Sequence, residues 1–352
     1  MRVFIYEYIC GGGLAGRPLP ESLAREGWAM LASIVEDFAR VEGCEVVTTL
    51  DERLAERRLA TRFVERLGGD AESERRTIER LAADCDWTLL IAPESDGILF
   101  NRVRWVEESG GRLLGPSSAV VAIAADKLVC GQMLGQAGVP AVSGRIVCLV
   151  DGLLDDCNFP AVLKPRDGAG SQSTFLVPNA AAASRVLREA AAEGLTGDGL
   201  LQAFLPGRPA SVSFLVGAAG ACPLLAGEQL LSDDGRFRYR GGRLPLPPPA
   251  ATRAVTLAAH AVAAVPRLAG FVGVDIVLGD DAADDCVIEL NPRLTTSYVG
   301  VRRLARANLA ERMLRVAAGQ EIEPISWRAG TVSFSADGRV AYSEADPGNS
   351  CR

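Results

Sequence analysis

Residues 272–293 read VGVDIVLGDDAADDCVIELNPR, and this stretch decides the fold of the second half of the chain. Two apolar runs, 272–278 and 286–290, flank a polar loop centred near residue 282, which predicts an antiparallel hairpin. Pairing about that centre sets Asp275 opposite Glu289. Side chains alternate along a strand, so Asn291 shares the face of Glu289. One face therefore presents two carboxylates and an amide oxygen, with Arg293 just beyond.

This set of oxygen atoms predicts a metal site made of Asp275, Glu289 and Asn291. Carboxylate and amide oxygens without imidazole or thiolate are the ligands that Mg²⁺ and Mn²⁺ prefer, usually together with substrate phosphates. The residues alone leave one alternative open, in which the same side chains form a solvated polar face of a hairpin.

Lys127 and Lys164 are the two lysines of a chain that otherwise uses arginine as its basic residue. A compact ammonium group on a flexible stem is suited to reaching a phosphate as a point charge. Lys164 ends an apolar strand predicted over 159–164, and the small-residue segment 167–171 follows it. Glycines there let backbone N–H groups approach phosphate oxygens. We predict that residues 168–171 form a mobile lid over a triphosphate, with an ordered turn as the alternative.

The N-terminal part alternates between predicted strands and helices, which indicates a parallel α/β sheet over residues 1–115. The part after residue 116 favours an α+β arrangement with antiparallel pairs, ending in one helix over 301–317. The expected N-terminal elements are a strand at 2–8, a helix at 20–40, a strand at 45–49, charged helices at 51–67 and 71–84, and a strand at 87–92.

Taken in order, these features resemble the ATP-grasp superfamily of carboxylate–amine ligases over residues 116–319. The resemblance rests on both lysines, the loop 167–171, the hinge strand 201–207, the hairpin carboxylates and Arg293. It implies an ATP-grasp fold with a Rossmann-like N-terminal domain. The implied domains are a pre-ATP-grasp domain (1–115), an ATP-grasp domain (116–320) with a lid subdomain (140–205) and a metal-bearing subdomain (206–320), and a C-terminal tail with short strands (321–352).

The resemblance also implies the cofactors and the roles of the site residues. ATP is the expected cosubstrate, with Mg²⁺ or Mn²⁺ held by Asp275, Glu289 and Asn291. Arg293 and Lys164 are the expected catalytic residues. The chain departs from the family pattern at the hinge, where it lacks the common glutamate. The implied ATP contacts are Lys127, Lys164, Gly168, Ala169, Gly170, Ser171, Gln202, Ala203 and Phe204.

Four further segments, at 4–13, 91–94, 239–242 and 291–297, are similar to the tyramine–L-glutamate ligases of methanofuran biosynthesis. That similarity implies joining the γ-carboxylate of L-glutamate to the amine of tyramine, through an acyl phosphate, with release of ADP and phosphate. Glu94, Thr295 and Thr296 are the expected substrate contacts, with Glu94 pairing with an ammonium group. Two alternatives remain: a ligase for another amino acid and amine, and a non-catalytic ATP-binding protein.

The composition disfavours several other classes of protein. A net charge of −7 with scattered basic residues argues against a nucleic-acid or membrane-surface partner. The single histidine, His260, argues against a Ser-His-Asp site. No apolar run reaches about 18 residues, and we expect a cytoplasmic enzyme with small-molecule substrates, compatible with a homodimer. A G-x-G-x-x-G match at 11–16 is followed by Pro18 and Pro20, which disfavours a dinucleotide-binding turn.

Overall fold

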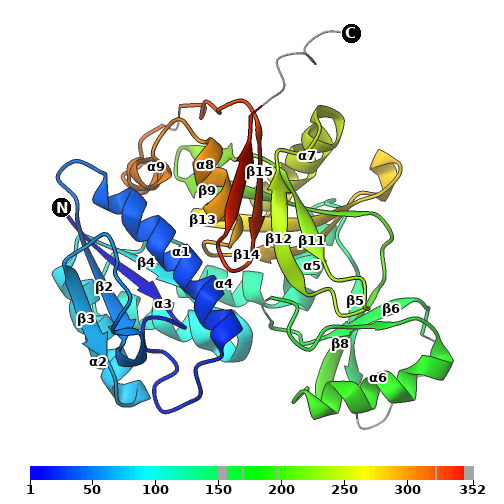
Figure 1. Ribbon diagram of the computed structural model, residues 1–352. Helices are drawn as coiled ribbons and strands as arrows, with labels where there is room; N and C mark the ends of the chain where they lie inside the picture. Colours follow the sequence, from blue (N-terminus) through cyan, green and yellow to red (C-terminus); the bar gives the residue numbers. More distant parts are fainter. Residues whose placement is uncertain (150–156, 169, 196, 322, 345–352) are drawn as a thin grey trace.

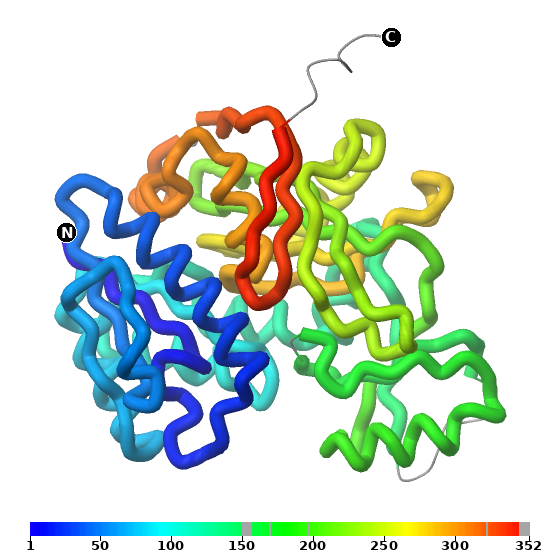
Figure 2. The backbone as a smooth tube through the Cα atoms, in the orientation of Figure 1, coloured from blue at the N-terminus to red at the C-terminus, as the bar shows by residue number. Residues whose placement is uncertain are grey.

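The structure is a computed structural model that describes residues 1–149, 157–168, 170–195, 197–321 and 323–344. Ala169, an expected ATP contact, lies outside the described residues. The described chain forms three sheets that follow one another along the sequence (Figure 1). The smooth backbone trace shows the N-terminal part (blue) and the part that holds the second sheet (green) on opposite sides of the molecule, with the part that holds the eight-stranded third sheet between and above them (Figure 2).

The N-terminal sheet is parallel, in the order β3-β2-β1-β4, which confirms the predicted α/β arrangement. The helix predicted over 51–67 is wrong. A single 3-10 turn, Glu52–Leu54, is followed by strand β3 at the edge of the sheet. The charged composition that suggested a helix is equally typical of a half-exposed edge strand. The elements are β1 (Arg2–Glu7), α1 (Glu21–Ala39), β2 (Glu45–Asp51), β3 (Phe63–Leu67), α2 (Ala71–Asp84), β4 (Trp87–Ile91) and α3 (Ile98–Glu108).

The second sheet is small and antiparallel, in the order β5-β8-β6-β7. Helix α6 covers one face of it and buries Ala183, Val186 and Ala190 in a separate small core. The Asn179 side chain accepts a hydrogen bond from the N–H of Ala182 and so caps the helix. The elements are β5 (Gly144–Cys148), β6 (Ala161–Lys164), β7 (Phe175–Val177), α6 (Ala180–Ala192) and β8 (Asp198–Ala203).

The third sheet has eight strands along the path β14-β13-β9-β11-β12-β15-β16, with β10 paired to β9. Its strands are β9 (Arg208–Gly217), β10 (Gly220–Pro223), β11 (Gly227–Leu231), β12 (Tyr239–Leu244), β13 (Gly270–Leu278), β14 (Cys286–Asn291), β15 (Thr331–Ser335) and β16 (Val340–Ser343). The last two strands come from the predicted C-terminal tail and extend the sheet from β12.

Five helices accompany this sheet, and they differ from the sequence prediction at one place. The helix expected over 301–317 is two helices, because the chain leaves helical geometry at Ala305 and Asn308 caps a new start. In the described ranges no single helix could span a membrane; α4 and α5 reach the length and apolar composition only together, across a 90° bend. The helices are α4 (Ser118–Ala125), α5 (Lys127–Gln136), α7 (Pro248–Ala264), α8 (Ser297–Leu304) and α9 (Leu309–Ala317).

Helix α1 joins the N-terminal sheet to the third sheet through a buried polar cluster. The Tyr298 hydroxyl and the Arg302 guanidinium of α8 both donate to the carboxylate of Asp37, at 2.6 and 2.8 Å for the Oδ2 contacts. The Asn308 amide donates to the carbonyl of Asp37 at 2.8 Å. These contacts hold the C-terminal part of α1 against α8 and α9, and so fix where its N-terminal part lies.

Candidate active site

The hairpin β13–β14 has the register predicted from the sequence. Asp275 pairs with Glu289 and Gly273 pairs with Asn291. The register shifts at the next step, where Ile276 pairs with Val287 and Ile288 becomes the extra residue of a β-bulge. The Asn291 amide donates to Asp275 Oδ2 at 3.1 Å, so the three expected metal ligands lie together.

A cavity of about 790 Å³ opens between the second and third sheets and collects most of the predicted site. Both lysines, the hinge end of β8, the hairpin carboxylates and the start of α8 all line it. Glu94 is not among the described residues that do so. The predicted residues on its wall are Lys127, Lys164, Gly168, Gly170, Ser171, Gln202, Ala203, Phe204, Asp275, Glu289, Asn291, Arg293, Thr295 and Thr296.

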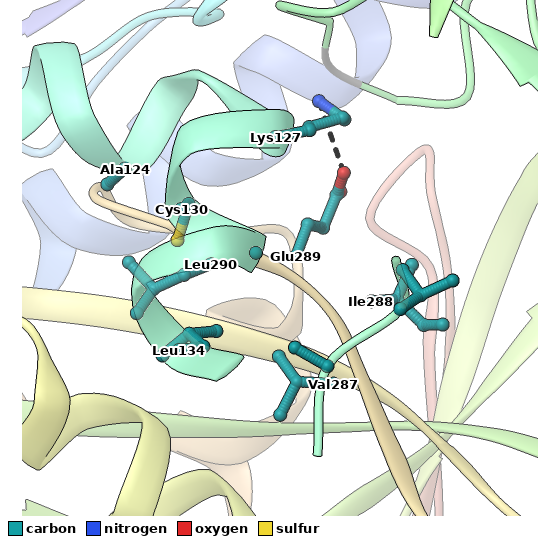
Figure 3. Close-up of a pocket in the computed structure, with 11 residues that line it drawn as sticks. Ala124, Lys127, Cys130, Leu134, Val287, Ile288, Glu289 and Leu290 are labelled. Atoms are coloured by element: carbon teal, nitrogen blue, oxygen red, sulfur yellow. Dashed lines mark ion pairs between the residues drawn. The ribbon is translucent and has the colours of Figure 1, made fainter. Parts of the chain in front are cut away.

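Lys127 is the first residue of α5 and points at the hairpin. Its Nζ lies 3.2 Å from Glu289 Oε2 (Figure 3). The same Nζ lies 2.5 Å from the carbonyl oxygen of Gly168. Cys130 and Leu134 of the same helix are buried against β14 beneath this ion pair. The packing of α5 against β14 therefore directs the Lys127 ammonium group toward both Glu289 of the predicted metal site and the loop 167–171.

The two hairpin carboxylates and the two lysines perturb one another. Burial, helped by the charge of Glu289, raises the pKa of Asp275 to about 8. Burial alone would also raise the pKa of Glu289, but the charges of Lys127 and Lys164 lower it below its usual value. Burial lowers the pKa of Lys164 to about 8. The cluster is therefore short of positive charge at Asp275 when both carboxylates are ionised.

The donor set fits a divalent cation that prefers oxygen. No group of three or more His, Cys, Asp or Glu side chains suited to a metal occurs in the part of the chain that the structure describes. The Asp275–Glu289 pair supplies two carboxylates, and Asn291 supplies an amide oxygen. Two facing carboxylates, one with a raised pKa, are relieved by such a cation, so the residues fit Mg²⁺.

Arg293 is held from the N-terminal domain, which the sequence did not predict. Its Nε and Nη2 atoms donate to the two carboxylate oxygens of Glu94 at 2.8 and 3.0 Å. The Glu94 carboxylate is therefore paired with Arg293 in this structure, and its contact with a substrate ammonium group stays a prediction. The two residues are 199 positions apart, so no local pattern could indicate the pair.

Three other cavity residues escaped the sequence analysis. Gln229 of β11 donates from Nε2 to Asp275 Oδ1 at 2.8 Å. Glu26 of α1 accepts from the Thr296 hydroxyl at 2.6 Å. Phe237 lies beside Phe204, with ring centroids 6.1 Å apart and planes tilted by 31°. Glu26 lies on a helix whose pattern only indicates burial of one face, so nothing in the sequence singled it out.

The cavity has an apolar end and a charged end. Phe204 and Phe237 form the apolar end, and Val142 before β5, Ile276 of β13 and Ile288 of β14 add apolar side chains to the cavity wall. Flat apolar walls of this kind suit a purine ring. The charged end carries the lysines, the carboxylates and Arg293. A nucleotide fits with its base at the apolar end and its phosphates between the lysines.

Family models match two consecutive parts of the chain. A pre ATP-grasp 3 domain matches residues 44–121, and an ATP-grasp domain matches residues 124–297. Two curated relatives are the tyramine–L-glutamate ligases of Methanocaldococcus jannaschii and Methanocaldococcus fervens. The first is 23% identical over 327 residues, covering 91% of each chain. The second is 23% identical over 324 residues, covering 91% of this chain and 95% of the relative.

Solved structures share the fold and confirm its predicted class. An ATP-grasp superfamily protein from Archaeoglobus fulgidus is 24% identical with a TM-score of 0.69, covering 98% of this chain and all of its own. An L-amino acid ligase from Bacillus licheniformis is 16% identical, with a TM-score of 0.67 and coverages of 94% and 78%. A biotin carboxylase domain dimer from Hydrogenobacter thermophilus, in complex with MgADP, is 16% identical, with a TM-score of 0.71 and coverages of 94% and 73%.

Proposed function

Because this chain belongs to the ATP-grasp superfamily, whose cofactors are ATP and Mg²⁺, we propose that it is a carboxylate–amine ligase. One observation carries the proposal: a single cavity gathers both lysines, the facing carboxylates and the partly buried Arg293. A non-catalytic nucleotide-binding protein has no need of Asp275, Glu289 and Arg293 together. The same residues are what transfer of a phosphoryl group requires.

The residues at the charged end divide the work on ATP between them. Lys127 and Lys164 bind the phosphates, and backbone N–H groups of Gly168, Gly170 and Ser171 approach them from the loop. Mg²⁺, when bound by the hairpin carboxylates, neutralises phosphate charge. Arg293 faces the oxygens on which negative charge grows during transfer, and Glu94 holds its guanidinium plane in place. Lys164 and Arg293 are therefore the proposed catalytic residues.

A carboxylate is a poor electrophile, so its activation precedes formation of the amide. The substrate carboxylate oxygen attacks the γ-phosphorus of ATP, the bond to the β-phosphate oxygen breaks, and ADP leaves. The amine nitrogen then attacks the acyl carbon of the mixed anhydride, loses a proton, and expels phosphate. A cavity that covers the anhydride protects it from water.

We infer that the substrates are L-glutamate, through its γ-carboxylate, and tyramine. The support comes from the two relatives with this printed activity, each matched over 91% of the present chain. Thr295 and Thr296 both line the charged end; Thr295 offers a hydroxyl group to a carboxylate-bearing substrate, whereas the Thr296 hydroxyl donates to Glu26. A homodimer is a further proposal, supported by the dimeric biotin carboxylase domain of the same fold.

The experiment is an ADP-release assay with ATP, Mg²⁺, L-glutamate and tyramine, with products identified by mass spectrometry. We expect γ-glutamyltyramine, ADP and phosphate in equal amounts, and no product with tyrosine in place of tyramine. Product with another amine alone would keep the ligase and replace the substrate. ADP release that never yields an acceptor-dependent product, across a panel of amino acids and amines, would refute the ligase.

A further inference from the structure

The charged residues on the cavity wall outnumber those that the proposed function uses. Among the described residues that line it, the acids are Glu26, Asp275 and Glu289, and the bases are Lys127, Lys164, Arg240 and Arg293. The hairpin acids are assigned to the metal, and three of the bases are assigned to phosphates. One carboxylate, Glu26, and one guanidinium, Arg240, are left over.

Glu26 presents a half-engaged carboxylate to the cavity. Its Oε1 accepts a hydrogen bond from Thr296 at 2.6 Å, and in the described part of the chain no basic side chain forms an ion pair with it. Burial lowers the pKa of Arg293, and the charges of Glu94 and, after it, Glu26 raise the pKa above its usual value. Glu26 thus lies close to the reacting end of the cavity and has acceptor capacity for a cation.

Arg240 reaches the cavity because of a β-bulge. Leu230 pairs with Gly241 and Leu231 pairs with Tyr239, so Arg240 is the extra residue on β12. Two consecutive side chains, Tyr239 and Arg240, therefore both line the cavity, which strict alternation along a strand would prevent. No hydrogen bond or ion pair of the Arg240 guanidinium occurs within the described ranges.

The β15–β16 hairpin brings these two residues to the same end of the cavity. The N–H of Ala336 in its turn donates to the carbonyl of Arg240 at 3.1 Å. At Gly338, in the same turn, a Cβ atom would lie 2.5 Å from the Cβ of Ala29. Ala29 lies three residues after Glu26 on α1, so both face the same side of the helix. The trace shows the tip of this hairpin beside α1 (Figure 2).

We propose that Glu26 and Arg240 form a site for the head group of an α-amino acid, with Glu26 accepting from the α-ammonium and Arg240 binding the α-carboxylate. The inference rests on the proposed function and deepens it. An amino acid held by both head charges keeps its α-carboxylate away from the phosphates. The carboxylate left to be phosphorylated is then that of the side chain, so the substrate is a dicarboxylic amino acid joined through its side chain.

Two analogues test each contact separately. Glutarate is glutamate without its α-ammonium, and 4-aminobutyrate is glutamate without its α-carboxylate. Their binding and that of L-glutamate are measured by titration calorimetry in the presence of Mg²⁺ and a non-hydrolysable ATP analogue. We expect the wild-type protein to bind glutamate roughly 10- to 100-fold more tightly than either analogue, because each lost charge-assisted contact contributes about 1.5–3 kcal/mol.

The affinity of each variant should no longer depend on the ligand group that the replaced side chain bound. Glu26→Gln should weaken the binding of glutamate and 4-aminobutyrate by roughly 10- to 100-fold and leave the binding of glutarate unchanged. Arg240→Gln should weaken the binding of glutamate and glutarate by the same factor and leave the binding of 4-aminobutyrate unchanged. Glu21→Gln and Arg243→Gln are matched controls on the same helix and strand, and neither residue lines the cavity. Glu26→Asp and Arg240→Lys should recover part of the affinity.

Other outcomes overturn the inference and separate it from the proposed function. Glutamate affinity within about twofold of wild type in both variants refutes the head-group site, as does equal loss of all three ligands in a folded variant. If the wild type forms a glutamyl amide but accepts glutarate and 4-aminobutyrate equally well, the ligase stands and the head-group site falls. If no amino acid binds, the proposed substrate class falls, and the head-group site falls with it.

Discussion

The two ends of the cavity are built in different ways. The phosphate end is the charged end with both lysines and the hairpin carboxylates, and its residues lie within the ATP-grasp match. Its central pair, Asp275 and Glu289, is set by the register of one hairpin. The substrate end, which we define by Glu26 and Arg240, is assembled from α1 and the strand β12, which are far apart in the sequence. The proposed phosphate contacts thus depend mainly on local pairing, whereas the proposed substrate contacts depend on how distant elements meet.

The largest expected effect tests whether the phosphate end is catalytic. Glu289→Gln keeps the shape of the side chain and removes the charge that faces Lys127 and Asp275. We expect kcat for ADP release to fall roughly 100- to 1,000-fold with the fold intact. Asp280→Asn, in the exposed loop of the same hairpin, is the control and should be neutral. Wild-type turnover in Glu289→Gln would refute the metal site.

The next prediction concerns the contact by which the segment after β4 holds Arg293 of the phosphate end. Glu94→Gln removes the carboxylate that holds Arg293 by two hydrogen bonds. A displaced guanidinium cannot follow the transferring phosphoryl group, so kcat should fall roughly 10- to 100-fold while KM for ATP changes little.

Two variants sharpen that prediction. Glu94→Asp restores the charge and should recover part of kcat, whereas the exposed Glu56→Gln should have no effect. A large rise in KM for the amino acid, with kcat unchanged, would instead return Glu94 to direct substrate binding.

The next prediction is that the buried charge of Lys164 lowers the free energy of unfolding. Burial lowers its pKa to about 8, below the ordinary value of 10.5. Below pH 8 the folded state carries a buried charge that the unfolded state solvates freely. Lys164→Met should therefore raise the free energy of unfolding at pH 7 by roughly 1–3 kcal/mol while abolishing ATP binding.

The pH dependence gives the sign of this effect. Between pH 8 and 10.5 the unfolded wild-type chain holds a proton that the folded chain has lost, so wild-type stability due to Lys164 rises with pH in that window. Urea unfolding should show that Lys164→Met exceeds the wild type in free energy of unfolding by less at pH 10 than at pH 7. An advantage that is independent of pH would contradict the assigned cause.

The smallest expected effect concerns the loop over the phosphates. The N–H of Asp96 donates to Asp167 Oδ2 at 2.9 Å, which links the N-terminal domain to the predicted lid. Asp167→Ala removes one exposed hydrogen bond, so KM for ATP should rise only roughly two- to tenfold. Exchange of the amide hydrogens near residues 166–172 should become faster. Asp233→Ala, at an exposed position, is the control. Unchanged hydrogen exchange in Asp167→Ala would show that the Asp96 contact does not stabilise the loop.

Particular residues show how far sequence reasoning could reach. The pairing of Asp275 with Glu289 was predictable because a short loop fixes the register of its own hairpin. The same reasoning failed at 51–67, where alternation at the edge strand β3 was hidden by charged side chains. It also missed the bulge at Arg240, because a bulge on β12 depends on its partner β11 and leaves no mark in the sequence of one strand.

The sequence by itself determined the α/β and α+β order of the sheets, the two lysines, and the pairing of Asp275 with Glu289 on one hairpin, because these depend on residue type and on contacts between near neighbours. Only the tertiary structure decided which charges meet across the cavity. It paired Arg293 with Glu94 over 199 positions, placed Glu26 beside Thr296, and brought Arg240 to the wall of the cavity. The physical reason is that helix and strand periodicity sets the buried face of an element, whereas its facing partner is set by packing of the whole chain.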